Sequence, residues 1–390
     1  MFALSQPKGF NHKRVKTWRQ AFLQWQAELG EHGELGRRAC HAWRKIEDFA
    51  AKHMPELLRT LQPGVCNAVV DRAFHNLAPA LRVLLLIHNG QRLAFESVHD
   101  RKRDSEAAAR SLFHGLLGGY SFYSSVVCSR MLPFAQKNFL RCRGSTVMAI
   151  AQPTMVDDRF FVVEVETADI IAIDVTEGYC FAAAPAGPNR DGVLRWLEAY
   201  AEMLASGMYK VEPMMTQDPK VQEQSRGISL FPQRPPLQVE AVTRGVRVRA
   251  SAIFAPGMSG ERSGAGTKFF FVYSVRFALL AEEEQRARWP ATAGPFRLLV
   301  SVQLRARHWV IRNAAGAVTG EVRGEAVVGE YPILTPGGEE FVYQSGTQQD
   351  EAVGSMEGRF AFVEGTLARP GPEFDAECPR FQLRIPDYVF

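Results

Sequence analysis

The sequence lacks the residue patterns that mark common catalytic and metal-binding proteins. It contains no C-x-x-C pair, no H-E-x-x-H motif and no G-x-S-x-G motif. His88 and His308 have no second histidine or cysteine at ligand spacing, so we expect structural roles, with His308 at a strand end. We therefore expect no catalytic residue, no metal and no cofactor. No secretory signal precedes the scattered cysteines, which indicates a reducing compartment: Cys40, Cys66, Cys128, Cys142, Cys180 and Cys378.

Long apolar runs and a strong net charge are also missing. The run LRVLLLIHNG is far shorter than the ~20 residues that cross a bilayer. A net charge of +4 over 390 residues does not indicate a dedicated nucleic-acid binder. We expect a cytoplasmic protein with neither a membrane nor a nucleic acid as a partner.

Acidic residues are absent from Met1 to Ala27, whereas five lysines and arginines occur there. Such a segment is either the basic leader of a first helix or an organelle presequence, and the second alternative would place the protein in mitochondria. Helical spacing of Trp43, Ile46 and Ala50 predicts helix up to about residue 62, with a break at GELG, residues 33–36.

The residues present predict an α+β multidomain chain. Residues 1–62 form a basic leader and helical segment, and 63–210 mix strands at 159–165 and 168–175 with a closing helix, DGVLRWLEAYAEMLASG. Asn189 or Asp191 can cap that helix. The apolar segment before it, LAPALRVLLLIHNGQRL, is expected to end in an Asn-Gly turn.

Residues 211–240 hold five prolines among glutamines and serines, which predicts a linker without regular structure. From 241 to 390 the apolar period becomes two, and KFFFVYSVRFAL places alternate aromatic residues on one face. Short strands separated by turns such as NAAG and TPGG predict a two-sheet antiparallel β-sandwich.

Five segments of this carboxy-terminal part, in order, resemble the ApaG family: FFFVYSVRF, VSVQLRARHWVIRNAAGAV, EVRGEAVVGEYPILTPGGEEFVYQSG, VGSMEGRFAF and PRFQL. The resemblance implies a sandwich of the fibronectin type III or immunoglobulin type, in agreement with the period of two.

Residues 60–210 resemble the SUKH superfamily of cell-wall-assembly regulators and toxin-immunity proteins, through LAPALRVLLLIHNGQRL, LLGGYSFYSS and the helix around Trp196. A SUKH-like domain followed by an ApaG domain resembles the family of F-box only protein three and its plant relatives. In that family an F-box precedes both domains and recruits a ubiquitin-ligase scaffold. Only about sixteen residues precede Trp18 here, fewer than an F-box needs, so we expect none in this sequence.

The stretch RGEAVVGE, residues 323–330, resembles the glycine-rich loop of ApaG proteins, with Ala326 in place of its middle glycine. Pro332 and Pro336 exclude a following helix, and a phosphate loop needs one. We expect Gly324 and Gly329 to take positive φ between strands. Resemblance to the ApaG loop gives the candidate binding residues, with a partner protein as the expected ligand: Gly324, Glu325, Val328, Gly329 and Glu330.

Three functions remain open at this point. The first is a non-enzymatic interaction protein, resembling the substrate-recognition part of an F-box ubiquitin-ligase adaptor and acting in the ubiquitin pathway. The second is a structural subunit of a large cytoskeletal, ciliary or organellar assembly. The third is a phosphate- or nucleotide-binding ApaG module.

Overall fold

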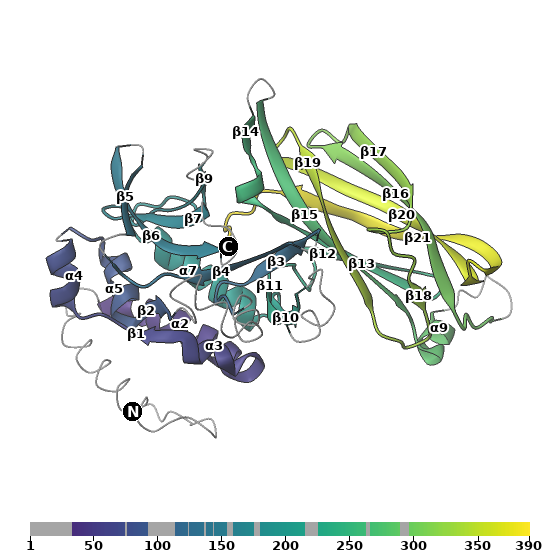
Figure 1. Cartoon of the computed structure of the whole chain (residues 1–390), viewed down its shortest axis with the longest axis horizontal. Coiled ribbons are helices and arrows are strands. Elements are labelled where there is room, and N and C mark those ends of the chain that lie inside the picture. Colours follow the sequence, from purple (N-terminus) through teal and green to yellow (C-terminus); the bar gives the residue numbers. More distant parts are fainter. Residues whose placement is uncertain are drawn as a thin grey trace, which may run out of the picture.

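A computed structural model of the chain shows two lobes side by side, with most of the helices in one and long antiparallel strands in the other (Figure 1). Most of the regular structure is β-strand. The predicted amino-terminal leader and the charged segment 99–110 lie outside the described residues. The structure describes residues 33–74, 76–92, 114–123, 125–135, 138–142, 144–153, 159–174, 180–214, 225–262, 266–288 and 296–390.

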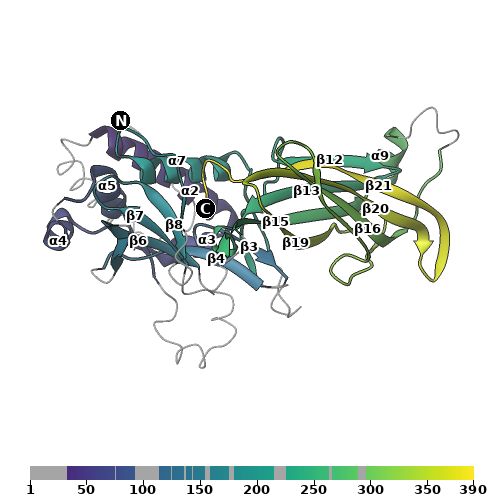
Figure 2. The same ribbon diagram turned by 90° about the horizontal axis from the view of Figure 1, so that it is seen from above.

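Two long helices cover one face of the amino-terminal sheet (Figure 2). They are α2 (Gly33–His53) and α7 (Gly192–Ala205), which pack against each other, and their buried residues include Trp43, Ile46 and Leu197. GELG, where a break between helices was predicted, forms the first turn of α2, which begins at Gly33, and the residues before it lie outside the described ranges. Shorter helices complete the layer: α3 (Pro55–Thr60), α4 (Asn67–Ala73) and α5 (Pro79–Ile87).

The predicted closing helix is confirmed, although its cap differs from a standard one. Asp191 is the N-cap residue of α7, but its carboxylate makes no cap hydrogen bond. It instead accepts from Arg38 on α2, at 2.7 Å, and from Arg195, at 3.0 Å. Arg38 also binds Glu198 with two nitrogens, at 2.8 and 2.7 Å. The side chain that could cap the helix therefore joins it to α2.

The apolar segment after Leu77 differs from the prediction. It forms helix α5 and then strand β2 (His88–Gln91), which pairs with β1 (Leu61–Pro63). Asn89 and Gly90 therefore lie in a strand and form no hairpin turn. Gly90 has a φ of +65°, and a Cβ there would lie 2.5 Å from the Leu132 carbonyl carbon.

A nine-stranded sheet underlies the helices, and the predicted strands at 159–165 and 168–175 are confirmed as β7 and β8. Strand β5 (Phe139–Cys142) pairs with β6 beside the main order. Along the sheet that order is β10 (Lys210–Pro213), β11 (Arg226–Ser229), β3 (Gly119–Phe122), β4 (Ser125–Met131), β6 (Ser145–Pro153), β7 (Arg159–Glu164), β8 (Ile170–Asp174) and β9 (Cys180–Ala182).

The predicted linker, 211–240, is not irregular throughout. Strand β10 enters it, β11 lies within it, and β12 (Gln238–Thr243) begins before its end. Pro213 is the last residue of β10, an edge strand, where a missing N–H is tolerated. Pro213 therefore lies at a strand end, Pro232, Pro235 and Pro236 lie in the connection between β11 and β12, and the segment adds an edge to the amino-terminal sheet.

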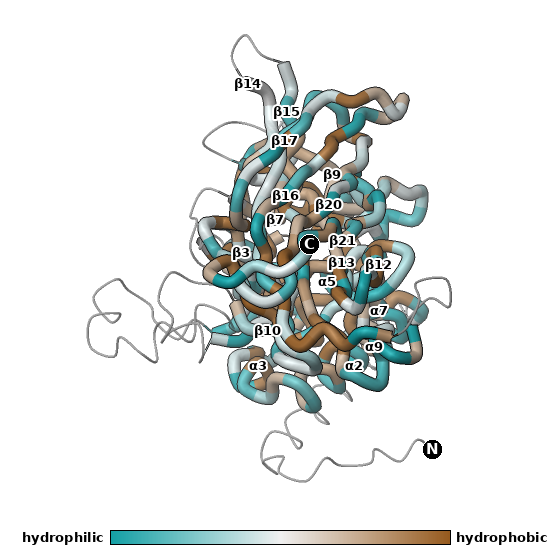
Figure 3. Tube along the Cα trace, turned by 90° about the vertical axis from the view of Figure 1, so that its right-hand side faces the viewer, coloured by the Kyte–Doolittle hydropathy of each residue, from teal (hydrophilic) through white to brown (hydrophobic). Residues whose placement is uncertain are grey.

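The carboxy-terminal lobe confirms the expected antiparallel sandwich. One sheet has the order β12, β13 (Val246–Phe254), β15 (Gly266–Leu279) and β14 (Gly260–Arg262), with β19 (Phe341–Gln349) also pairing with β15. The β14–β15 hairpin projects beyond the body of the lobe (Figure 3). The facing sheet has the order β17 (Val318–Glu325), β16 (Val302–Asn313), β20 (Val353–Thr366) and β21 (Arg369–Arg384), with β18 (Ile333–Leu334) beside β16.

Strand β15 is buried on both faces over its second half, which explains how the lobes join. Phe271, Tyr273 and Phe277 point into the sandwich core, as their alternation predicts. On the opposite face Val272 is fully buried against the amino-terminal lobe, in a cluster with Tyr120 and its neighbours. A short 3-10 helix, η3 (Pro256–Met258), and helix α9 (Glu282–Ala287) flank this sheet.

Candidate binding surface

The stretch RGEAVVGE ends strand β17 and forms a tight turn. Val327 and Glu330 exchange two backbone hydrogen bonds, of 3.0 and 2.9 Å, and enclose Val328 and Gly329. The φ angles of these two residues are +51° and +83°, which is the backbone of a type I′ turn. Such turns normally carry Asn-Gly or Gly-Gly, because both central residues need positive φ.

Positive φ falls on different residues from those predicted. Gly329 has it, as expected, but Gly324 is a paired residue of β17 opposite Arg307. Ala326, at +59°, and Val328 take the left-handed conformation instead. Left-handed backbone costs an L-residue roughly 1–2 kcal/mol, and a β-branched side chain there is an outlier. The surroundings must therefore hold this turn in place.

Arg307 on β16 holds the turn. Its Nη1 donates to the carbonyl oxygens of Glu325, at 2.8 Å, and Ala326, at 2.6 Å. The Ala326 N–H donates to the Arg305 carbonyl, at 2.9 Å, and Val327 is fully buried. A Cβ at Gly324 would lie 3.3 Å from the Arg307 Nη1, so the glycine leaves room for the guanidinium. The loop is anchored by Val327 and Arg307, and its tip faces solvent.

The tip exposes apolar side chains beside two carboxylates. Val328 is 49% exposed and Ile333 on β18 is 53% exposed. Tyr331 is 38% exposed and donates its hydroxyl to Glu325, at 3.2 Å. Glu330 is exposed in the turn. We call Glu325, Val328, Glu330, Tyr331 and Ile333 the turn surface. Among the predicted site residues it includes three, while Gly324 and Gly329 shape the backbone beneath it.

The geometry of the turn does not favour a phosphate. Pro332 follows the turn and leads into strand β18, so no helix amino terminus is directed at it. The side chains at the tip are acidic or apolar, and Arg307 already has carbonyl acceptors. A binding partner that suits this surface carries an apolar group with basic groups beside it.

The two singled-out histidines have structural contacts. His308 lies in the middle of β16, not at a strand end, and its Nε2 is 2.6 Å from the Glu321 Oε1. Arg323 and then His308 hold the pKa of Glu321 below its usual value. His88 is buried, with its Nε2 2.8 Å from the Glu47 Oε1 and its ring 4.3 Å from that of Trp43.

The described residues contain no cluster of histidine, cysteine, aspartate or glutamate that could hold a metal ion. Among the helices of the described ranges, none is long and apolar enough to cross a bilayer.

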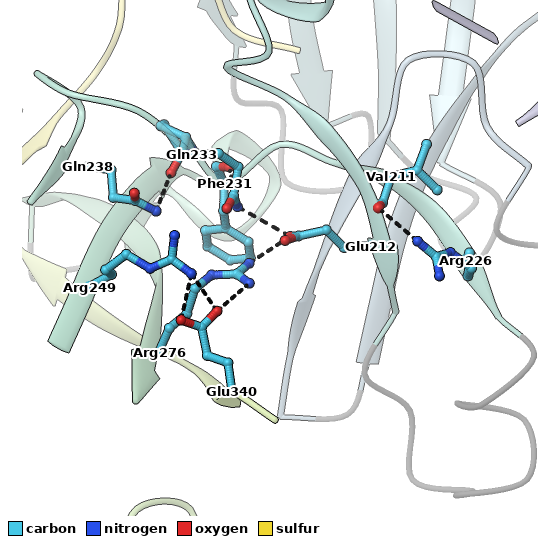
Figure 4. Close-up of polar contacts among 10 residues, drawn as sticks. Val211, Glu212, Arg226, Phe231, Gln233, Gln238, Arg249, Arg276 and Glu340 are labelled. Carbon is cyan, nitrogen blue, oxygen red and sulfur yellow. Dashed lines mark hydrogen bonds and ion pairs between the residues drawn. The ribbon is translucent and has the colours of Figure 1, made fainter. Parts of the chain in front are cut away.

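Sequence reasoning missed a charged cluster between the lobes (Figure 4). Glu212 on β10 of the amino-terminal lobe binds Arg276 on β15 of the sandwich, at 2.7 Å. Glu340 lies near three guanidiniums, at 2.5 Å from Arg249, 3.5 Å from Arg276 and 3.9 Å from Arg247. We call these five residues the seam cluster. The alternation in GVRVRAS places Arg247 and Arg249 on one strand face, but only the fold brings Glu212 to them.

The carboxy-terminal sandwich and its turn are similar to known ApaG proteins in sequence. The family model for the ApaG domain matches residues 260–364. The Protein ApaG of Rhodopseudomonas palustris strain TIE-1 is 37% identical over 148 residues, which cover 38% of this chain and 93% of that protein. A crystal structure described as an ApaA protein of Bordetella pertussis is 26% identical, covers 39% of this chain and 98% of that one, and has a TM-score of 0.28.

One relative matches nearly the whole chain. The F-box protein SKIP16 of Arabidopsis thaliana is 31% identical over 407 residues, which cover 97% of this chain and 84% of that protein. The chain belongs to the family of SKIP16, with an ApaG domain in its carboxy-terminal part.

Proposed function

We propose that this chain is a non-enzymatic interaction protein that binds a partner protein through the turn surface. It would act like the substrate-recognition part of an F-box ubiquitin-ligase adaptor. Its relation to SKIP16 over 97% of the chain supports this class of function. The SUKH-like character of residues 63–210, the cytoplasmic location and the link to the ubiquitin pathway belong to the same proposal and stay predictions.

One observation carries the proposal: Val328 is exposed at a backbone position that disfavours valine. Its φ of +51° suits glycine or asparagine, and its side chain is 49% exposed. Strained residues held by their surroundings cluster at functional sites, since the strain must be offset elsewhere. Valine at this position does not stabilise the free chain, but its exposed side chain can make an apolar contact with a partner at the tip of the turn.

The partner should present an apolar side chain flanked by lysine or arginine. Val328, Tyr331 and Ile333 supply the apolar contact. The carboxylates of Glu325 and Glu330 lie beside them, and neither forms an ion pair within the described part of the chain. Charges at the edge of such a contact guide association and select partners, while the apolar residues at its centre supply most of the affinity.

Affinity purification of the full chain with mass spectrometry tests the proposal. The bait variant is Val328→Asp, which puts a charge at the centre of the turn surface. The matched control is Val353→Asp, because Val353 is 45% exposed at the start of β20 and outside that surface. Partners that the wild type and the control retain, and the variant loses, support the proposal. Equal recovery with all three baits contradicts it.

The identity of the partners separates this function from the structural alternative. Recovery of a ubiquitin-ligase scaffold supports the adaptor role. Stoichiometric recovery of structural proteins, without ligase components, would instead favour a subunit of a large assembly.

A further inference from the structure

The seam cluster contains more positive than negative charge. Its three guanidiniums face two carboxylates. Arg249 lies directly opposite Arg276 in the β13–β15 register, and Arg247 is two residues along the same face. Like charges directly opposite each other on neighbouring strands are destabilising. The pairing of β13 with β15 therefore gathers positive charge at one point on the sheet.

The hydrogen-bond donors of the cluster also outnumber its acceptors. Glu340 is shared by all three arginines, and the Arg247 contact, at 3.9 Å, is too long for a hydrogen bond. The Nε atoms of Arg247 and Arg249 are buried and have no hydrogen-bond partner within the described structure. Buried donors are normally satisfied, and an unsatisfied one in a native fold requires an explanation.

Neighbouring carboxylates do not remove the excess. Glu240 on β12 lies opposite Arg249 in the strand register, but the two form no ion pair in the described residues. Glu212 is engaged by Arg276, at 2.7 Å, and by Gln233, at 3.3 Å. Within the described residues, these carboxylates therefore leave the cluster with more guanidinium donors than acceptors.

Arg247 and Arg249 are partly accessible to solvent. Their side chains are 30% and 22% exposed for Arg247 and Arg249, whereas that of Arg276 is only 10% exposed. Partial burial lowers the effective dielectric constant, so a charge bound here is held more strongly than on an open surface. Strand β13, hydrogen-bonded on both sides by β12 and β15, fixes the spacing of the two side chains.

We propose that Arg247 and Arg249 form a binding site for a tetrahedral oxyanion of the phosphate class. A planar guanidinium can donate two parallel N–H hydrogen bonds to such an anion, and two guanidiniums on the same strand face can bind one anion jointly. The site lies on the outer face of the β13–β15–β19 sheet, whereas the turn surface belongs to the facing sheet. It is therefore separate from the proposed partner site.

Anion binding at this site stabilises the joined lobes. The negative charge of the anion offsets the one excess positive charge of the seam cluster, beside the Glu212–Arg276 ion pair that connects β10 to β15. A ligand that binds only the folded chain raises its stability in proportion to the logarithm of ligand concentration.

Thermal unfolding of the full chain in sodium phosphate tests the proposal, with sodium chloride at equal ionic strength as the reference. We expect phosphate to raise Tm with the logarithm of its concentration above Kd, by on the order of 2–4 °C at concentrations well above Kd. The double variant Arg247→Gln, Arg249→Gln should lose this shift. The control Arg359→Gln, which removes an exposed arginine paired with Asp375 on the facing sheet, should keep it. An equal Tm rise in chloride, or a phosphate shift retained by the double variant, overturns the proposal.

A second measurement keeps the proposal testable if the double variant does not fold. If circular dichroism shows that the double variant is unfolded, the single variant Arg247→Gln is used, because Arg247 makes only the 3.9 Å contact. Phosphorus NMR of inorganic phosphate should then show broadening by the wild type and less by this variant. Unchanged broadening contradicts the site. Tighter binding of a phosphoserine peptide than of phosphate would identify a phosphorylated side chain, and not the free ion, as the source of the anion.

Discussion

The indole N–H of Trp196 donates a hydrogen bond to the carbonyl oxygen of Val389, 2.6 Å away, although 193 residues separate them in the sequence. The Val389 N–H donates in turn to the Ala183 carbonyl, at 2.9 Å, and the Phe390 ring packs 5.1 Å from that of Tyr200. The last residues of the chain thus leave the sandwich and end inside the amino-terminal lobe (Figure 2). Together with the seam cluster, they fix the two lobes to each other.

Trp196→Phe should destabilise the chain by about 1–3 kcal/mol beyond the cost of lost ring volume, because the buried Val389 carbonyl loses its donor. Trp43→Phe is a matched control. Trp43 is equally buried, at 1% exposure, but its Nε1 has no hydrogen-bond partner within the described residues. Urea unfolding of both variants measures the difference. If the two variants lose the same free energy, the Trp196–Val389 hydrogen bond contributes nothing measurable.

Val328→Asn should raise the stability of the chain by about 0.5–1 kcal/mol, because asparagine tolerates the left-handed backbone and Asn-Gly is the preferred type I′ pair. The control is Val318→Asn, since Val318 is also exposed, at 54%, but lies in strand β17. There asparagine should be neutral or destabilising. Urea midpoints of the two variants give the comparison.

The same substitution links stability to function. If Val328 contacts a partner, Val328→Asn should bind that partner more weakly while it unfolds at higher urea. A variant that is more stable and binds equally well would show that the strain at Val328 serves no binding role.

The sequence predicted those features that a local period determines. Alternation in KFFFVYSVRFAL identified the inner face of β15, and helical spacing identified α7. The opposite face of β15 could not be assigned, because Val272 is buried by residues more than 100 positions away, such as Tyr120. A continuous apolar run does not distinguish helix from strand, and this is why α5 was not foreseen.

The glycine positions in RGEAVVGE predicted only one of the residues with positive φ correctly. Their pattern pointed to Gly324 and Gly329, but the pairing of β17 with β16 extends through Glu325. The chain therefore has to reverse later, and Ala326 and Val328 take up the left-handed backbone. Where a strand stops pairing depends on its neighbour, so the exact placement of the reversal is not encoded in the glycines alone.

Acid should weaken the sandwich through Glu357 on β20. Arg380 holds the pKa of this carboxyl below its usual value, with Arg312 as a second donor. A carboxyl whose pKa is lower in the folded state stabilises the fold above its unfolded pKa of about 4.3, and this stabilisation is lost as pH falls through the folded value. Stability measured between about pH 5 and pH 2 should therefore fall less steeply in Glu357→Gln than in the wild type.

The reciprocal change checks the cause of the Glu357 effect. Arg380→Gln removes the donor that lowers the pKa of Glu357 most, so the acid-induced loss of stability should be smaller than in the wild type and should be complete at a higher pH. If the wild type and both variants lose stability identically as the pH falls, Glu357 does not contribute to the destabilisation by acid.

Cysteine reactivity should report the opening of the amino-terminal lobe. Cys66 is exposed, whereas Cys128 on β4 is fully buried, and burial raises the pKa of its thiol to about 12. Because the thiolate is the reactive form, the native chain should be modified rapidly by a disulfide reagent at Cys66 and slowly at Cys128.

Cys66→Ser removes the exposed thiol, and mass spectrometry of the labelled peptides separates Cys128 from the half-buried Cys40, Cys142 and Cys180. In this background Trp196→Phe should speed the labelling of Cys128, since Tyr200 of the same helix donates its hydroxyl to Leu116, and Cys128 lies beside Gly115. Trp43→Phe, on the opposing helix, should speed it less. Labelling of Cys128 as fast as that of Cys66 in the wild type would mean that the lobe opens far more often than its packing implies.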